Sequence, residues 1–73
     1  MAKENNAPAE VRTNKEKVES WRWRRAKAGL SLEAMADLSG KKVPQLSNYE
    51  TGKTEPKAST IDSIEEILRQ HGV

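Results

Sequence analysis

The chain has 73 residues, a third of them charged, and a formal net charge of +2. A chain of this length forms one modest hydrophobic core, and without cysteine it has no disulfide or thiolate metal site. No apolar run approaches the roughly 18 residues that a membrane-spanning helix requires, and the N-terminus lacks a signal-peptide core. A single histidine and scattered acidic residues leave no catalytic arrangement. We therefore expect a soluble, cytoplasmic module with no enzymatic activity, no metal and no cofactor.

The first segment, residues 1–13, is polar and shows no helical or strand periodicity. It contains Pro8, and its two basic and two acidic side chains cancel in charge. This composition is typical of a flexible arm rather than of a packed element. We therefore expect the folded domain to span residues 14–73.

A first helix is expected from position 14 or 15 to position 27, because Gly29 stops the helical pattern. Trp21 falls on the apolar face of this helix, with Val18. A helix turns Trp23 about 200° away from Trp21, so the two rings cannot form one platform on which bases stack. We expect Trp21 in the core and Trp23 partly exposed. An exposed tryptophan is also a candidate contact with a second copy or another protein.

The stretch that follows indicates two short helices joined by a tight turn. Apolar side chains recur there every three to four residues, as one buried helix face requires. They form one series before Gly40 and another after it: Leu32, Met35 and Ala36, then Val43, Leu46 and Tyr49. Ser31 is expected to cap the first helix, and Gly40 and Gly52 stand where each helix ends in a left-handed turn. Helices this short must pack across a shared core to be stable.

The last segment, after Pro56, predicts an amphipathic helix. Its apolar positions have helical spacing: Ala58, Ile61, Ile64, Ile67 and Leu68. We expect Ser59 or Thr60 to cap its start, and His71 to be a lone C-terminal histidine rather than a metal ligand.

The two central helices resemble the helix-turn-helix family of phage Cro and repressor proteins. That family has a small residue in the first helix, a glycine four positions later and a branched aliphatic six positions beyond. An aromatic or aliphatic residue, glutamate, a variable residue and glycine close the second helix. The matching residues are Ala36, Gly40, Leu46, Tyr49, Glu50 and Gly52. The similarity covers residues 18–73.

This resemblance implies an all-α, lambda-repressor-like bundle of about five short helices, with the helix-turn-helix unit at about 31–51. It also implies an ion pair between Arg25 and Glu50, because the family's arginine typically pairs with its glutamate. Some repressors of this family wrap an N-terminal arm around DNA. A tail without such a role is the simpler interpretation of residues 1–13.

By the same resemblance, the second helix of the unit enters the major groove of DNA. The residues expected at base edges are Val43, Pro44, Gln45, Ser47 and Asn48. Glutamine and asparagine can pair bidentately with adenine, and apolar groups contact the thymine methyl. The residues expected to contact phosphates are Ser31, Lys41, Lys42, Thr51 and Lys53, with Arg22 and Arg24 on the first helix. For each of them, an ordinary solvated side chain is the alternative.

The charge distribution agrees with this prediction. Residues 18–53 carry seven basic and four acidic side chains, whereas residues 54–73 carry two basic and four acidic ones. We expect a sequence-specific regulator that binds double-stranded DNA, a small phage-type or prophage-type repressor acting as a homodimer on a palindromic operator. The alternative is a protein-interaction module, such as an antitoxin or a DNA-bound adaptor. Such a module would use Trp23 and the C-terminal helix, and the candidate dimer or partner contacts are Trp23 and Leu68.

Overall fold

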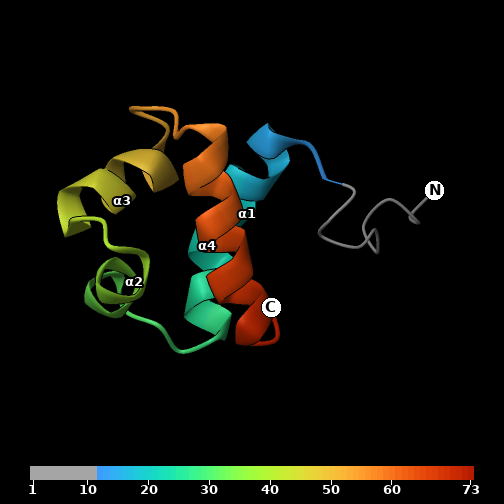
Figure 1. Cartoon of the computed structure of the whole chain (residues 1–73), viewed down its shortest axis with the longest axis vertical. Helices are drawn as coiled ribbons and strands as arrows, with labels where there is room; N and C mark the ends of the chain where they lie inside the picture. Colours follow the sequence, from blue (N-terminus) through green and yellow to red (C-terminus); the bar gives the residue numbers. More distant parts are fainter. Residues whose placement is uncertain (1–11) are drawn as a thin grey trace.

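A computed structural model describes residues 12–73, and these residues form four α-helices and no strand. The helices are α1 (Asn14–Lys27), α2 (Leu32–Ser39), α3 (Val43–Thr51) and α4 (Ala58–Gln70). α1 and α4 lie alongside each other, and α2 and α3 lie together on one side of that pair (Figure 1). The predicted all-α class is confirmed.

The expected number of five helices is wrong for the described part of the chain. No glycine or proline interrupts residues 58–70, so the final segment folds as one helix of 13 residues. The predicted arm also needs correction at its end. Thr13 belongs to α1 as its N-cap: its hydroxyl accepts the Glu16 N–H at 3.1 Å, and the Glu16 carboxylate accepts the Thr13 N–H at 2.9 Å. Residues 1–11 of the expected arm lie outside the described residues.

The starts of α2 and α4 differ in how they are capped. The Ser31 hydroxyl accepts the Ala34 N–H at 3.0 Å, which confirms Ser31 as the cap of α2. The N-cap of α4 is Lys57, whose side chain makes no capping hydrogen bond. The expectation that Ser59 or Thr60 caps α4 is therefore wrong, because the helix begins before both of them.

Two glycines end α2 and α3 in the left-handed conformation that glycine adopts without steric cost. Gly40 has φ 74° and Gly52 has φ 83°. Beyond Gly52, the Lys53 N–H donates to the Asn48 carbonyl at 2.9 Å, which turns the chain back over the end of α3. The turn at Gly40 joins α2 to α3 at the short spacing that a helix-turn-helix needs, and the turn at Gly52 directs the chain from α3 toward α4.

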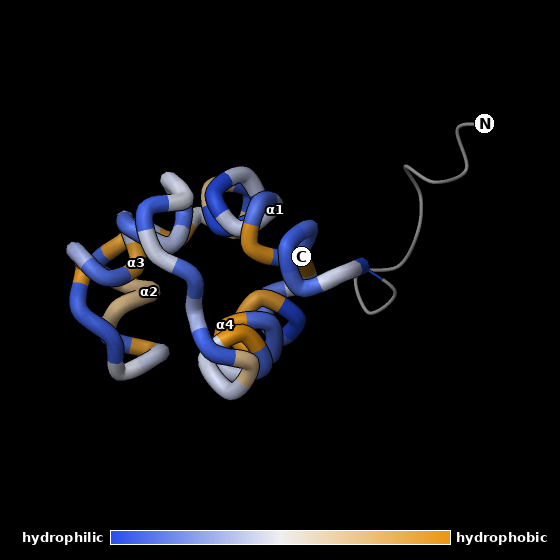
Figure 2. Tube along the Cα trace, turned by 90° about the horizontal axis from the view of Figure 1, so that it is seen from above, coloured by the Kyte–Doolittle hydropathy of each residue, from blue (hydrophilic) through white to orange (hydrophobic). Residues whose placement is uncertain are grey.

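The core lies where the four helices meet, and apolar segments face it from every side (Figure 2). Its buried apolar members are Trp21, Met35, Ala36, Leu46, Ile61, Ile64 and Leu68. The Trp21 ring meets Tyr49 of α3 edge to face, with ring centroids 6.5 Å apart. Leu68 is fully buried, so its prediction as a dimer or partner contact is wrong. Its side chain packs in the core of this chain and does not reach a second surface.

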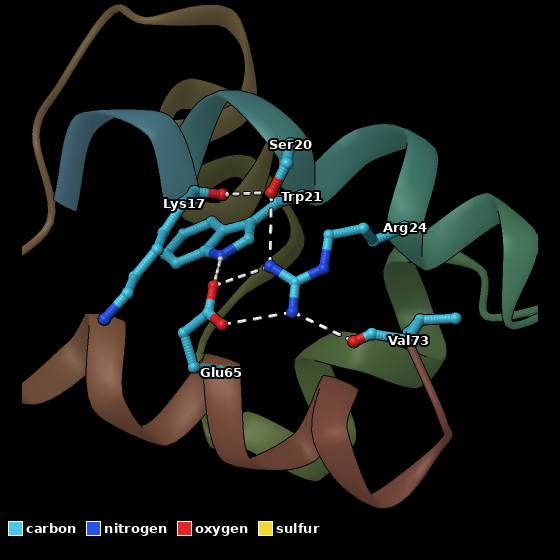
Figure 3. A network of polar contacts seen from close by, with 6 residues as sticks. All are labelled: Lys17, Ser20, Trp21, Arg24, Glu65 and Val73. Carbon is cyan, nitrogen blue, oxygen red and sulfur yellow. Dashed lines mark hydrogen bonds and ion pairs between the residues drawn. The ribbon is translucent and has the colours of Figure 1, made fainter. Parts of the chain in front are cut away.

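A buried network of polar groups joins α1 to α4 (Figure 3). The Arg24 guanidinium donates to both carboxylate oxygens of Glu65, at 2.8 and 3.0 Å. The Trp21 indole N–H donates to the same carboxylate at 2.8 Å, and Arg24 also donates to the Val73 carbonyl at 3.0 Å. The Ser20 hydroxyl accepts a further Arg24 N–H at 3.1 Å. Because both terminal nitrogens of Arg24 and both carboxylate oxygens of Glu65 are hydrogen-bonded, the two charges are compensated in the interior.

Burial alone would raise the pKa of Glu65, but the hydrogen bonds from Arg24 and Trp21 outweigh that effect and lower it. The carboxylate is therefore the form that the fold holds. Arg24 is only 3% exposed, so its prediction as a phosphate contact is wrong. The physical reason is that its guanidinium donates inward, to both carboxylate oxygens of Glu65 on the opposite helix and to the oxygens of Ser20 and Val73.

Candidate nucleic-acid interface

α3 is fixed to α1 by a second ion pair, between Arg25 and Glu50. The guanidinium donates to the two carboxylate oxygens at 2.8 and 3.1 Å, and a third N–H donates to the Leu30 carbonyl at 2.8 Å. The expected pair is thus present. The hydrogen bond to Glu50 raises the pKa of Arg25 despite partial burial. Because the pair connects the C-terminal part of α3 to α1, it sets the angle at which α3 stands out from the body of the molecule.

Four of the five residues expected to read bases lie on the part of α3 that does not face the core, and Val43 is the exception. Pro44 and Gln45 are exposed, whereas Ser47 and Asn48 are half-buried. Val43 is half-buried too and packs partly against the core, so only part of its side chain is available outside. Pro44 sits in the first turn, where its missing N–H has no intrahelical partner to lose.

Gln45 already uses one of its two polar groups within the protein. Its side-chain oxygen accepts the Lys42 N–H at 3.0 Å, which closes the first turn of α3 in place of a serine or threonine cap. Bidentate pairing with adenine needs that oxygen as an acceptor. In this arrangement one lone pair of that oxygen is already used, so Gln45 is less suited to bidentate pairing with adenine than a side chain whose amide is free.

Asn48 keeps both polar groups of its side chain free. Its backbone carbonyl accepts from Lys53 and Thr54, but its side-chain amide makes no hydrogen bond with any residue that the structure describes. A free amide can donate to N7 of adenine and accept from its N6 amino group, which are the two groups on the major-groove edge. Asn48 is therefore the residue of α3 best suited to read adenine.

The residues expected to contact phosphates differ in whether their charge or their hydrogen-bond donor is free. Lys42, Lys53 and Arg22 are exposed, and none forms an ion pair within the described residues. The Ser31 hydroxyl accepts a capping hydrogen bond, which leaves its proton available to a phosphate oxygen. The Thr51 hydroxyl instead donates to the Ser47 carbonyl at 2.9 Å, so in this conformation it has no proton to donate outside.

Glu65 is the residue that sequence reasoning missed. A signal for it was present, because Glu65 lies four positions after Ile61 and three before Leu68, on the buried face of an amphipathic helix. A carboxylate on such a face requires a buried partner. Nothing in the spacing says that this partner is Arg24, which lies 41 positions earlier.

Among residues 12–73, no three histidine or acidic side chains come together in a group that could hold a metal ion. In the same part of the chain, no helix has the length and apolar character needed to cross a bilayer.

Two short helices joined at Gly40, with the second one braced from behind and polar in front, define a helix-turn-helix DNA-binding domain. The family model of this helix-turn-helix domain matches residues 22–71. The chain therefore belongs to the helix-turn-helix family of Cro and repressor type, a family of DNA-binding transcription regulators. Searches of curated proteins and of solved structures gave no significant match.

Proposed function

We propose that this protein is a sequence-specific regulator of the phage or prophage repressor type, which binds a palindromic operator as a homodimer. The observation that carries the proposal is the state of α3. Its inner side is fixed by the Arg25–Glu50 pair and by Leu46 in the core, while Asn48 keeps a free amide. A rigid helix with an unpaired reading group is what direct readout in the major groove requires.

The roles within this site follow from the hydrogen bonds. Asn48 reads an adenine edge, and Pro44, with the accessible part of Val43, contacts a thymine methyl. Gln45 donates to an acceptor on a base or on the backbone, and Ser47 takes either role. Cations, all exposed except the half-buried Lys41, position the duplex through its phosphates without reading sequence. Those are Lys41, Lys42, Lys53 and Arg22, together with the Ser31 hydroxyl.

One copy of α3 covers only one short half-site. Two copies related by a two-fold axis would read half-sites about one helical turn, ~34 Å, apart. Repression would then follow from occlusion of a promoter by the bound dimer.

The direct test is selection of randomised duplex DNA by the purified protein at near-physiological salt. We expect enrichment of an inverted repeat, and we expect Asn48→Ala to lose discrimination at one base pair of each half-site by about 1–3 kcal/mol. Thr54→Val, a change in the loop beyond α3, is the control and should select the same repeat. Binding that falls steeply with salt and enriches no sequence would refute the proposal.

A second candidate function, a protein-interaction module, is favoured by Trp23. Its side chain is 53% exposed on α1, although a large aromatic group is costly to leave in water. Leu68 cannot contribute to such a contact, because its side chain is buried in the core. Sedimentation of the wild type and of Trp23→Ser separates the cases. If the wild type sediments as a dimer and Trp23→Ser as a monomer, Trp23 lies in the dimer interface. An unchanged dimer removes Trp23 from that interface.

A further inference from the structure

A small pocket of about 190 Å³ opens between the turn that joins α2 to α3 and the start of α4. We call it the hydroxyl pocket. Its lining residues are Ser39, Lys41, Ser59, Thr60, Ser63 and Ile64. Four of these carry hydroxyl groups, one is a cation and none is acidic. A water molecule occupies about 30 Å³ of liquid, so the pocket has room for a small polyatomic anion.

Thr60 gives the pocket its most specific feature. The residue is only 7% exposed, yet its hydroxyl has no hydrogen-bond partner among residues 12–73. Among residues 12–73, Arg12 Nη1 is the fully buried side-chain polar atom that lacks a partner. The unpartnered oxygen of Thr60 is not in this class, so it is not completely shielded from solvent. Buried hydroxyls normally find a partner. The Thr60 hydroxyl therefore has a proton that it can donate to a molecule in the pocket.

The start of α4 adds further unused donors. The first backbone hydrogen bond of this 13-residue helix runs from the Ile61 N–H to the Lys57 carbonyl, at 2.9 Å. The N–H groups of the three preceding residues have no acceptor in the described chain, and Lys57 supplies no side-chain cap. Unpaired N–H groups at a helix start carry partial positive charge and favour anions.

Lys41 supplies a full charge at the opposite wall. Its ammonium group forms no ion pair and no hydrogen bond within the described residues, so its charge is not neutralised by a carboxylate. Ser59 and Ser63 also make no side-chain hydrogen bond in this part of the chain. The hydroxyl of Ser39 is the exception, because it accepts the Lys41 N–H at 3.3 Å. The pocket thus combines one cation, three free hydroxyls and a free helix start.

We propose that the hydroxyl pocket binds a phosphoryl oxyanion. Its oxygens accept from the Thr60, Ser59 and Ser63 hydroxyls, and the Lys41 ammonium balances its charge. Two sources share this chemistry: a phosphodiester of bound DNA, and a free phosphate or phosphomonoester. The proposal does not depend on the proposed function, because the pocket's donors are unpaired whether or not α3 reads an operator.

The test uses the full chain and inorganic phosphate. We titrate ¹⁵N-labelled protein with phosphate, and in parallel with chloride at equal ionic strength. Saturable shifts of the Ser59 and Thr60 amide signals in phosphate, but not in chloride, are expected. Thr60→Val keeps the side-chain shape without the hydroxyl, and should weaken binding about tenfold because a hydrogen bond to a charged group is lost.

Matched variants separate the pocket from general charge effects. Ser63→Ala and Lys41→Gln should also weaken phosphate binding, whereas Thr54→Val and Lys27→Gln, outside the pocket, should leave it unchanged. Ser63 is exposed, so its variant tests the pocket even if Thr60→Val lowers the melting temperature. Absence of saturable shifts, or equal affinity in all variants, would overturn the proposal.

The same titration in the presence of saturating duplex DNA identifies the source. If DNA abolishes the phosphate-induced shifts, the pocket holds a backbone phosphodiester. If the shifts persist, the pocket holds a free phosphate or phosphomonoester. Either result follows from phosphoryl binding in the pocket, and failure of operator selection would affect neither.

Discussion

Arg24 and Arg25 are consecutive residues of α1, yet they connect this helix to two different regions. A helix turns successive residues by about 100°, so Arg24 faces α4 and meets Glu65, whereas Arg25 faces α3 and meets Glu50. The exposed fractions differ: 3% for the Arg24 side chain and 14% for Arg25. The α1–α4 contact is the drier of the two, and the α1–α3 contact lies nearer the proposed interface.

The difference shows how the chain separates stability from recognition. In the α1–α4 region, the side chains of Arg24 and Trp21 donate hydrogen bonds to Glu65 inside the protein. In the α3 region, one ion pair fixes the helix from behind and the side chain of Asn48 stays unpaired. Changes in the first region should therefore affect folding, and changes on the outside of α3 should affect binding.

The largest expected effect is that of Glu65→Ala. Removal of the carboxylate leaves the buried Arg24 charge without its partner, which costs about 3–5 kcal/mol of unfolding free energy. Denaturant unfolding measures this loss, with the exposed neighbouring Glu66→Ala as control. A loss below about 1 kcal/mol, the range of surface pairs, would show that the network is solvated rather than buried.

Acid should break the same contact without a mutation. The pKa of Glu65 lies below its ordinary value of 4.5, so the contact contributes its full stability above that pH. The contribution is lost as the pH falls through the lowered pKa. We expect the melting temperature to fall below pH 4.5 and the fall to be smaller in Glu65→Gln. Parallel pH profiles in the two proteins would contradict this assignment.

Glu50→Ala should cost less than Glu65→Ala, about 2 kcal/mol. Arg25 is closer to solvent and keeps its bond to the Leu30 carbonyl, so the unpaired charge is partly compensated. The same variant should also weaken operator binding, because α3 loses its brace. Thermal unfolding and a binding isotherm measure the two effects. An unchanged melting temperature would show that the Arg25–Glu50 pair does not hold α3 in place.

Gln45 permits a finer test, which rests on the proposed function. Gln45→Ala removes the acceptor for the Lys42 N–H and should cost about 1 kcal/mol, as for other N-terminal caps. Gln45→Glu keeps an acceptor there and should preserve stability, while its charge weakens binding to all DNA sequences alike. If Gln45→Glu instead changes which base is selected, Gln45 is a base reader.

The smallest effect is expected from the exposed pair of Glu66 and Arg69. Its side chains are 54% and 60% exposed, so solvent screens their attraction. Glu66→Gln should leave the melting temperature unchanged within error, which makes it the reference for both buried pairs. A clear loss in this variant would mean that burial does not rank the three ion pairs.

Much of this fold could be predicted from local sequence signals. Gly40 and Gly52 mark helix ends because few other residues adopt their backbone conformation, and Trp21 follows from helical spacing. The Arg25–Glu50 pair came from the family resemblance. Arg24 could not be assigned in this way, because two adjacent arginines look alike until the packing of α4 shows which one faces inward.

The candidate site was predictable by position but not by hydrogen bonding. Of the residues expected to read bases, Pro44, Gln45, Ser47 and Asn48 lie away from the core, whereas Val43 packs partly against it. The apolar spacing of Val43, Leu46 and Tyr49 fixes the inner side of α3. Spacing says nothing about which polar group a side chain has already used. The oxygen of Gln45 and the free amide of Asn48 differ for that reason alone.

The two tryptophans differ in solvent exposure, so their intrinsic fluorescence can report on two different parts of the protein. Trp21 is 2% exposed, with its indole N–H bonded to Glu65, whereas Trp23 is 53% exposed. Indole emission shifts to longer wavelength when the ring is exposed to water, and a quencher dissolved in water reaches Trp23 first. In a Trp23→Phe variant, the remaining emission would report the opening of α1 from α4 directly. Unlabelled protein would then suffice to follow folding on one side of the molecule while DNA is added to the other.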